Sequence, residues 1–248
     1  MLESIQVKDV VQRIKEWWGE LRTVLSEPGV ASWQHLCELL EQCPSREERA
    51  LAIENYCVES LRRWPESIHR RPTSAWIDSL HSGEFDVGLT LINSLKVEGA
   101  MLGDAGIKMI FDAPSLDGLR YLDLRNNLIT SRGFAHMLDA DCFSNLYELH
   151  LENNCIEDRA LEGFVHIETL ELRVLDMRGN RISEEGARQL ARAPALTNLK
   201  QLDLDPAPIG LDGMISIAES EHLDASLREI WSARLERLFP GYSHRQGG

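Results

Sequence analysis

The chain has 248 residues, of which 43% are hydrophobic and 27% are charged, and its formal net charge is −14. These proportions are ordinary for a globular chain that is long enough to bury a sizeable core. The acidic balance argues against nucleic acid and anionic membrane as partners, because both bind to surfaces rich in lysine and arginine.

Residues 1–18 lack the basic lead, the uninterrupted apolar stretch and the small-residue cleavage site of a secretory signal. No apolar run reaches the roughly eighteen residues that a membrane span needs. The five cysteines are odd in number and form no CxxC pair, which is typical of reduced thiols that serve as small apolar residues. We therefore expect a cytoplasmic protein without a cofactor.

Residues 1–88 are predicted to be helical. An apolar stripe ends before Pro28, a second helix is expected over 32–42, a third begins at the capping box from Ser45 to Glu48, and a fourth covers 74–80. Five of the six tryptophans lie in this part of the chain. The composition predicts a helical cap that packs on the segment that follows, and the alternative is a small helical domain that folds by itself.

From residue 92 onward, one apolar pattern recurs. It is clearest in LRYLDLRNNLI, which starts at Leu119 and has the spacing L-x-x-L-x-L-x-x-N-x-[LI]. The same spacing recurs every 26 or 27 residues, with starts at Ile92, Leu146, Leu172 and Leu199. A series of five matches in one register predicts five structural repeats.

Each repeat is predicted to be a strand followed by a short helix. Residues such as Leu122 and Leu124 alternate with polar ones, which is the pattern of a half-buried strand. An asparagine stands where the chain turns inward, and a buried asparagine there can pair with the backbone of neighbouring turns; these residues are Asn127, Asn154 and Asn180. A small residue then follows, where we expect the helix to approach the sheet, at Gly106, Gly133, Ala160, Gly186 and Gly213.

The strand pattern and the following I-x-x-x-G-A-x-x-L helix, seen best from Ile182 to Leu190, resemble the ribonuclease-inhibitor-like class of leucine-rich repeat proteins. The resemblance covers about half of the chain. It implies an α/β fold, namely a short leucine-rich repeat solenoid with parallel strands on the concave side and helices on the convex side. It also implies protein recognition as the usual role. A tryptophan-rich helical segment followed by repeats is similar, in addition, to bacterial leucine-rich repeat proteins with a helical companion segment.

Three parts are therefore predicted. Residues 1–88 form the helical cap or small domain, residues 89–218 form the solenoid of five repeats, and residues 219–248 form a C-terminal capping helix and a tail. The last part has apolar residues at helical spacing from Leu227 to Leu238. A degenerate sixth repeat that starts at Leu227 is the alternative.

The residues between the buried leucines are predicted to form three columns on the concave side. One column is Lys96, Asp123, His150, Asp176 and Asp203; the next is Glu98, Arg125, Glu152, Arg178 and Asp205; the third is Ser94, Tyr121, Glu148, Val174 and Gln201. Neighbouring strands lie about 4.8 Å apart, so the members of one column are near neighbours.

The leading hypothesis is a protein-interaction scaffold that binds a protein partner through this face. Aromatic and arginine side chains tend to dominate interface energies, and the candidate partner-binding residues are Tyr121, Asp123, Arg125, Tyr147, His150, Glu152, Asp176, Arg178 and Asp203. A structural explanation competes for one column, because Glu98, Arg125, Glu152 and Arg178 alternate in sign and can pair with one another across strands.

No catalytic signature is present, since the phosphate loop, H-E-x-x-H and G-x-S-x-G are all absent. We therefore expect no enzyme, and we assign no catalytic residue and no metal site. One alternative is a metal-dependent function at Asp123, His150 and Asp176, a ligand set that zinc accepts. Another is GTPase activation through Arg125 or Arg178, by resemblance to Ran GTPase activators. A third places the binding site in the tryptophan-rich segment, with the repeats as scaffold.

Overall fold

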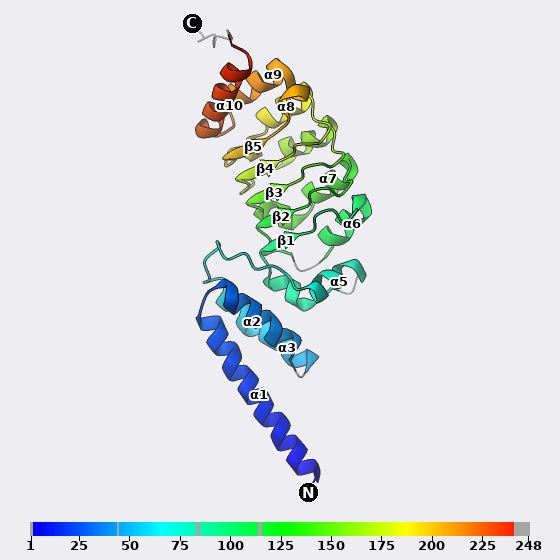
Figure 1. Cartoon of the computed structure of the whole chain (residues 1–248), viewed down its shortest axis with the longest axis vertical. Coiled ribbons are helices and arrows are strands. Elements are labelled where there is room, and N and C mark those ends of the chain that lie inside the picture. Colours follow the sequence, from blue (N-terminus) through cyan, green and yellow to red (C-terminus); the bar gives the residue numbers. More distant parts are fainter. Residues whose placement is uncertain (1, 44, 83–84, 114–115, 241–248) are drawn as a thin grey trace. The chain divides into compact units, whose positions relative to one another are not determined.

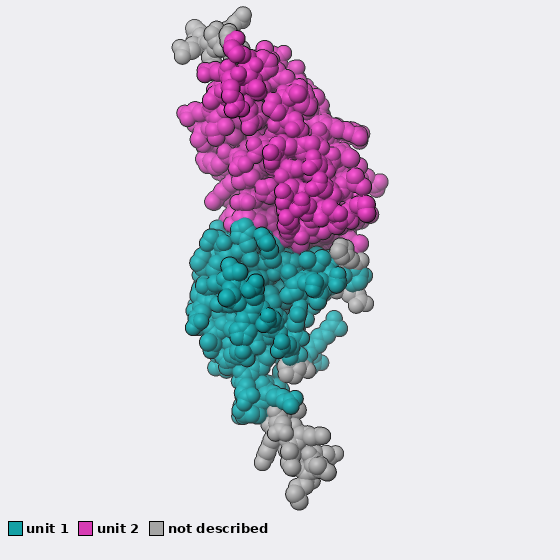
Figure 2. Space-filling view, in the orientation of Figure 1, with its two compact units in different colours: residues 1–94 teal, residues 95–248 magenta. Residues whose placement is uncertain are grey.

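The computed structural model describes residues 2–43, 45–82, 85–113 and 116–240. The predicted tail from Tyr242 to Gly248 lies outside these residues. The chain divides into two compact units, Met1–Ser94 and Leu95–Gly248 (Figure 2). The boundaries at residues 88 and 218, and the role of the first segment as a cap, stay predictions.

Unit 1 is helical throughout its regular structure. Its elements are α1 (Leu2–Ser26), α2 (Val30–Glu41), a continuous helical run of α3 (Arg46–Ala52), the π-helical turn η1 (Ile53–Cys57) and α4 (Val58–Leu61), then α5 (Ser74–Ser82) and the 3-10 helix η2 (Val87–Leu91). Ser45 accepts a hydrogen bond from the backbone N–H of Glu48 at 3.3 Å and so caps α3. This contact confirms the serine half of the predicted capping box.

Tryptophan indoles connect the helices of unit 1. Trp17 in α1 donates its Nε1–H to the carbonyl of Leu39 in α2 at 2.8 Å. Trp64, just after α4, donates its Nε1–H to the carbonyl of Leu25 in α1 at 3.1 Å. Both side chains are buried, and a buried indole N–H that finds a carbonyl avoids the cost of losing its bond to water. The tryptophans therefore fill the core and link the helices at the same time.

The sheet contains the strands β1 (Ser94–Lys96), β2 (Tyr121–Asp123), β3 (Glu148–His150), β4 (Val174–Asp176) and β5 (Gln201–Asp203), in chain order from one edge to the other. The strands from β2 to β5 pair in parallel with the register that the sequence repeat predicts, so Leu122, Leu149, Leu175 and Leu202 lie opposite one another. These leucines are buried. The predicted α/β fold with a parallel sheet is confirmed.

Within unit 2, a helix follows each strand, and these helices lie along one side of the sheet (Figure 1). They are α6 (Gly103–Phe111), α7 (Ser131–Leu138), η4 (Asp158–His166), α8 (Glu184–Ala191) and α9 (Pro206–Ala218), and the shorter 3-10 helices η3 (Asp141–Asn145) and η5 (Pro194–Leu196) precede β3 and β5. The helix of the third repeat, η4, is a 3-10 helix and not an α-helix.

Two of the small residues near the helix starts, Gly133 and Gly186, lie close to the preceding repeat and not, as had been expected, to the sheet. A Cβ on Gly133 would lie 2.5 Å from Oδ1 of Asp104, and one on Gly186 would lie 2.3 Å from Oδ1 of Asp158. Each aspartate belongs to the preceding repeat, so the close approach is between successive repeats and not to the sheet. The same Asp158 accepts hydrogen bonds from the backbone N–H and the hydroxyl of Ser183, at 2.8 and 2.5 Å.

A ladder of asparagines joins the repeats at the turn after each strand. The side-chain oxygen of Asn154 accepts hydrogen bonds from the backbone of Asn127 and Ile129, at 3.1 and 3.0 Å. Its amide donates to the carbonyls of Leu124 and Leu151, at 3.0 and 2.9 Å. The prediction that a buried asparagine pairs with neighbouring turns is confirmed.

The ladder has a direction, because each asparagine bonds to the repeat before its own. Asn127 accepts from the backbone N–H of Ala100 at 3.0 Å, and Asn180 accepts from that of Ile156 at 3.1 Å. The first repeat has no earlier repeat to bond, which explains why Ala100 occupies the equivalent position. In the fifth repeat the equivalent residue is Ala207, and the Asp205 carboxylate accepts from the Gly179 N–H at 2.6 Å instead.

The residue before each ladder position has a left-handed backbone. Gly99, Asn126, Asn153 and Gly179 have φ values of 68°, 58°, 56° and 69°. Glycine and asparagine are the residues that adopt this conformation at the lowest cost. In the fifth repeat this position is Pro206, whose ring fixes φ near −65° and so starts α9 directly.

The C-terminal segment forms a single helix, α10 (Ala225–Leu238). Its buried residues are Leu227, Trp231 and Leu235, and it packs against α9. The alternative of a sixth repeat that starts at Leu227 is wrong, because this residue lies inside the helix. Asp224 caps the helix by accepting from the backbone N–H of Ser226 at 2.9 Å, and Lys200 of the fifth repeat contacts Asp224 at 2.5 Å.

Replacing Asn154 with alanine is expected to lower the free energy of unfolding by about 2–4 kcal/mol, because buried donors and acceptors of two repeats lose their partner. Urea unfolding followed by circular dichroism measures the change. Asn145→Ala is the control, since the side chain of Asn145 donates one hydrogen bond, to the carbonyl of Asp117 at 3.2 Å, and its loss should cost less than about 1 kcal/mol. Equal losses in the two variants would contradict the role of the ladder.

Candidate functional site

The side of the sheet away from the helices, called the strand face below, carries the predicted columns. Tyr121, Glu148, Val174 and Gln201 are aligned across β2 to β5, and so are Asp123, His150, Asp176 and Asp203. The register confirms that the members of each column are neighbours. The side chains form two groups: charged residues toward the ends of the strands, and aromatic and arginine residues at their beginnings.

Two arginines on the strand face are held by the aspartate two residues earlier in the chain. Arg125 donates to the Asp123 carboxylate from Nε at 2.8 Å and from Nη2 at 2.7 Å. Arg178 makes the same two-pronged contact with Asp176, with Nε at 2.9 Å from Oδ1 and Nη2 against Oδ2. Burial alone would raise the pKa of Asp123, but the hydrogen bonds from Arg125 outweigh it and hold the pKa below its ordinary value.

The cross-strand pairs that the alternating column predicted are present at longer distances. Nη2 of Arg125 lies 3.4 Å from Glu98, and its Nε lies 3.9 Å from Oε1 of Glu152. Nη2 of Arg178 lies 3.8 Å from the same Oε1. The primary partner of each arginine is thus an aspartate on its own repeat, and the glutamates of the column are secondary partners.

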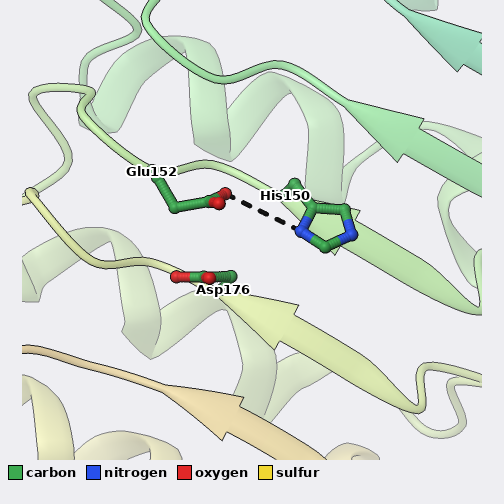
Figure 3. Close-up of side chains that lie close together, drawn as sticks. All are labelled: His150, Glu152 and Asp176. Atoms are coloured by element: carbon green, nitrogen blue, oxygen red, sulfur yellow. Dashed lines mark ion pairs between the residues drawn. The ribbon is translucent and has the colours of Figure 1, made fainter.

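His150, Glu152 and Asp176, called the carboxylate centre below, come together from the ends of β3 and β4 (Figure 3). One nitrogen or oxygen atom from each residue lies within 4.8 Å of the other two. The two nitrogens of His150 face the glutamates of its own repeat, with Nε2 3.8 Å from Glu148 and Nδ1 3.8 Å from Glu152. The metal hypothesis named Asp123 in place of Glu152, and the structure corrects it.

Glu152 is a buried carboxylate of the strand face that has one unsatisfied oxygen. The residue is 8% exposed, and its Oε2 atom is buried and accepts no hydrogen bond from the described residues. Burial raises the pKa of its carboxyl, and the nearby Asp176 carboxylate adds to the rise. The sequence placed Glu152 in a column of alternating charges, where it would be satisfied by arginines, and gave no sign that one oxygen would lack a partner.

The last member of the charged column, Asp203, is held by its surroundings. Gln201 donates to its carboxylate at 2.6 Å, and Nη2 of Arg234 in α10 lies 3.9 Å away. Asp176, the neighbour of Asp203 in register, is held by Arg178. The repulsion between these two like charges is therefore offset by a separate hydrogen-bond donor at each aspartate.

A second group, the aromatic–arginine cluster, consists of Arg120, Tyr121, Tyr147 and Arg173. The rings of Tyr121 and Tyr147 meet edge to face, with centroids 6.4 Å apart. The guanidinium of Arg173 lies 4.7 Å from the Tyr147 ring centroid, and that of Arg120 lies 5.6 Å from it. Arg173 is exposed, and the other three are partly exposed.

The sequence predicted the two tyrosines as partner-binding residues but not the two arginines. Arg120, Tyr147 and Arg173 directly follow the first leucine of their repeats, together with Lys200 of the fifth repeat. These residues lie before the strands, whereas the predicted columns consist of residues within and after them. The same register that aligned the other columns would have aligned these residues.

Burial makes two of the cysteine thiols, Cys57 and Cys142, poor nucleophiles. Cys37, Cys43, Cys57, Cys142 and Cys155 are unpaired. Burial raises the pKa of Cys57 to about 12 and, with help from the Asp117 charge, that of Cys142 to about 11. A thiol with such a pKa is protonated near neutral pH and is a poor nucleophile.

Residues 172–191 match a family model described as Leucine Rich repeat. The match covers the fourth predicted repeat, from Leu172 through β4 to the end of α8, so the chain contains a leucine-rich repeat as its pattern predicted. A search of curated protein sequences found no match. None of the helices in the described ranges combines the length and the apolar character that crossing a membrane requires.

Replacing Arg178 with alanine is expected to lower the free energy of unfolding by about 1–3 kcal/mol, because Asp176 is 3% exposed and would keep a buried charge without its main partner. Chemical unfolding at neutral pH measures the loss. Arg181→Ala is the control, because its contact with Glu157 at 3.3 Å lies on the surface and should contribute less than about 1 kcal/mol.

Asp176→Asn in the Arg178→Ala background should recover part of the loss, since it removes the unpaired charge. A double variant no more stable than Arg178→Ala would contradict the assignment of the pair.

Proposed function

We propose that the protein is an interaction scaffold that binds a protein partner through the strand face. Leucine-rich repeat domains generally mediate protein–protein interaction, and the chain contains such a repeat. In this proposal the five repeats form a short solenoid of the ribonuclease-inhibitor-like class, with the strand face on its concave side. Residues 1–88 serve as a helical cap, as in the bacterial proteins that the chain resembles, and the setting is cytoplasmic.

The observation that carries the proposal is the aromatic–arginine cluster at the beginnings of β2, β3 and β4. Tyrosine and arginine are enriched among the residues that contribute most to binding. Here Tyr121 lies on β2, Tyr147 directly precedes β3, and Arg173 directly precedes β4. Side chains on neighbouring strands of a hydrogen-bonded sheet lose little freedom when a partner docks, which favours affinity.

The charged part of the strand face contributes to selectivity more than to affinity. Asp123 and Asp176 are already paired with arginines, so a partner gains little by contacting them. A non-cognate protein whose charged groups do not match this surface would pay the cost of their desolvation without gaining a new hydrogen bond or ion pair. The candidate residues Asp123, Arg125, Glu152, Asp176, Arg178 and Asp203 are proposed to act in this way, and Tyr121, Tyr147 and His150 are proposed as the anchors.

The proposed role is not enzymatic. Arg125 and Arg178, the two residues considered for GTPase activation, each hold an aspartate of their own repeat. An arginine that completes another protein's active site must extend toward that protein. The two-pronged contacts keep these guanidinium groups on the sheet, which favours recognition over GTPase activation.

The test compares capture of partners from a cell extract by three forms of the full chain. The face variant carries Tyr121→Ala, His150→Ala and Arg173→Ala, which leave the buried arginine–aspartate pairs in place. It is expected to lose the partners that the wild type captures, with quantitative mass spectrometry as the readout. The helix-side variant carries Arg132→Ala, His136→Ala and Arg159→Ala and should keep them.

A further variant addresses the alternative that the tryptophan-rich segment binds the partner. Trp18 and Tyr56 of unit 1 have ring centroids 5.1 Å apart, and Tyr56 is 51% exposed. Trp18→Ala with Tyr56→Ala should leave capture unchanged. Loss of capture in this variant together with retention in the face variant would overturn the proposal and move the site to unit 1.

A further inference from the structure

We propose that the carboxylate centre, His150, Glu152 and Asp176, is a binding site for one divalent transition-metal ion of the zinc type. The inference shares these three residues with the proposed partner-binding face, but it does not require a partner, and zinc binding by the isolated chain tests it separately. It rests on the ligand set, on the distances among the three residues and on the unsatisfied oxygen of Glu152.

The distances suit a metal after a small contraction. Nδ1 of His150 lies 3.8 Å from Oε2 of Glu152, and the three potential ligand atoms lie within 4.8 Å of one another. Bond lengths of about 2.0–2.2 Å in a tetrahedral site place ligand atoms roughly 3.4 Å apart. Side-chain rotation of His150, which is 32% exposed, can close most of the difference without moving the strands.

The buried oxygen of Glu152 is the feature that a metal ion explains best. The two oxygens of this carboxylate face different surroundings: Oε1 lies near Arg125 and Arg178, whereas Oε2 lies near His150 and accepts no hydrogen bond from the described residues. A buried anionic oxygen without a donor is costly. A cation between Glu152, His150 and Asp176 would supply the missing contact.

The surroundings of the centre also suit a cation. Three N–H groups of Arg178, the backbone N, Nε and Nη2, hold the Asp176 carboxylate, and a carboxylate has about four lone-pair directions, so one stays available for a cation. Outer hydrogen bonds of this kind orient metal ligands in known sites. Carboxylates outnumber guanidinium groups here, with Asp123, Glu148, Glu152, Asp176 and Asp203 against Arg125, Arg178 and Arg234.

The mixed ligand set points to the class of ion. An imidazole nitrogen with two carboxylates suits zinc and related transition ions, whereas calcium and magnesium prefer oxygen ligands alone. Three protein ligands would leave a fourth position, and His150 is 32% exposed, so solvent can reach the centre. Water or an outside ligand would complete the coordination.

Equilibrium dialysis of the full chain against Zn²⁺ near neutral pH, after removal of metal with a chelator, tests the site. The wild type is expected to hold one equivalent more than His150→Gln. Both His150→Gln and Glu152→Gln should weaken binding at that site at least tenfold, since loss of even an outer hydrogen bond typically costs tenfold or more. If Glu152→Gln does not fold, His150→Gln decides the matter, because its side chain is partly exposed and not part of the core.

The matched control is His136→Gln. His136 contacts Asp112 at 2.9 Å and has a similar exposure of 34%, but it belongs to no cluster of three potential ligands among the described residues. It should bind zinc as the wild type does. Substitution with Co²⁺ should give the weak visible bands of nitrogen and oxygen ligands. Equal zinc content in the wild type and His150→Gln, or an intense thiolate band with Co²⁺, would overturn the proposal.

Discussion

The side-chain amides of Asn127, Asn154 and Asn180 connect successive repeats at the one place where the chain leaves the sheet and turns toward the helices. A strand of three residues offers few hydrogen bonds to hold such a turn. Each asparagine supplies hydrogen-bond partners to backbone groups of its own repeat and of the repeat before it. The residues directly before the three asparagines, Asn126, Asn153 and Gly179, have a left-handed backbone at this turn.

The strand face depends on this ladder. The parallel strands are aligned residue by residue, so Asp123, His150 and Asp176 lie side by side. The fixed register keeps these side chains close to one another. Arginines two residues later neutralise the aspartates from within the same repeat. Glu152 has no such neighbour of its own, so it carries the unsatisfied oxygen. The aligned strands therefore account both for the arginine–aspartate pairs around the carboxylate centre and for the unsatisfied Oε2 of Glu152 within it.

The sequence predicted the repeats, their register and the columns, because each depends on spacing along the chain. It did not predict which atoms meet. The sequence placed Asp123 and His150 in one column, and they are partners in register, but Nδ1 of His150 faces Glu152. The glycines were expected against the sheet, but Gly186 makes room for an aspartate of the previous repeat. Side-chain choices of this kind are decided by competition among neighbours, which spacing alone does not reveal.

In the proposed function, the strand face of the repeats contacts the partner and the tryptophan-rich helices do not. Hydroxyl-radical oxidation of side chains in the free protein and in the captured complex, read by mass spectrometry, tests it most directly. If the strand face binds the partner, Tyr121, Tyr147 and His150 become protected in the complex while Trp18 and Tyr56 oxidise at unchanged rates. Protection of Trp18 and Tyr56 with no change at the strand face would contradict it.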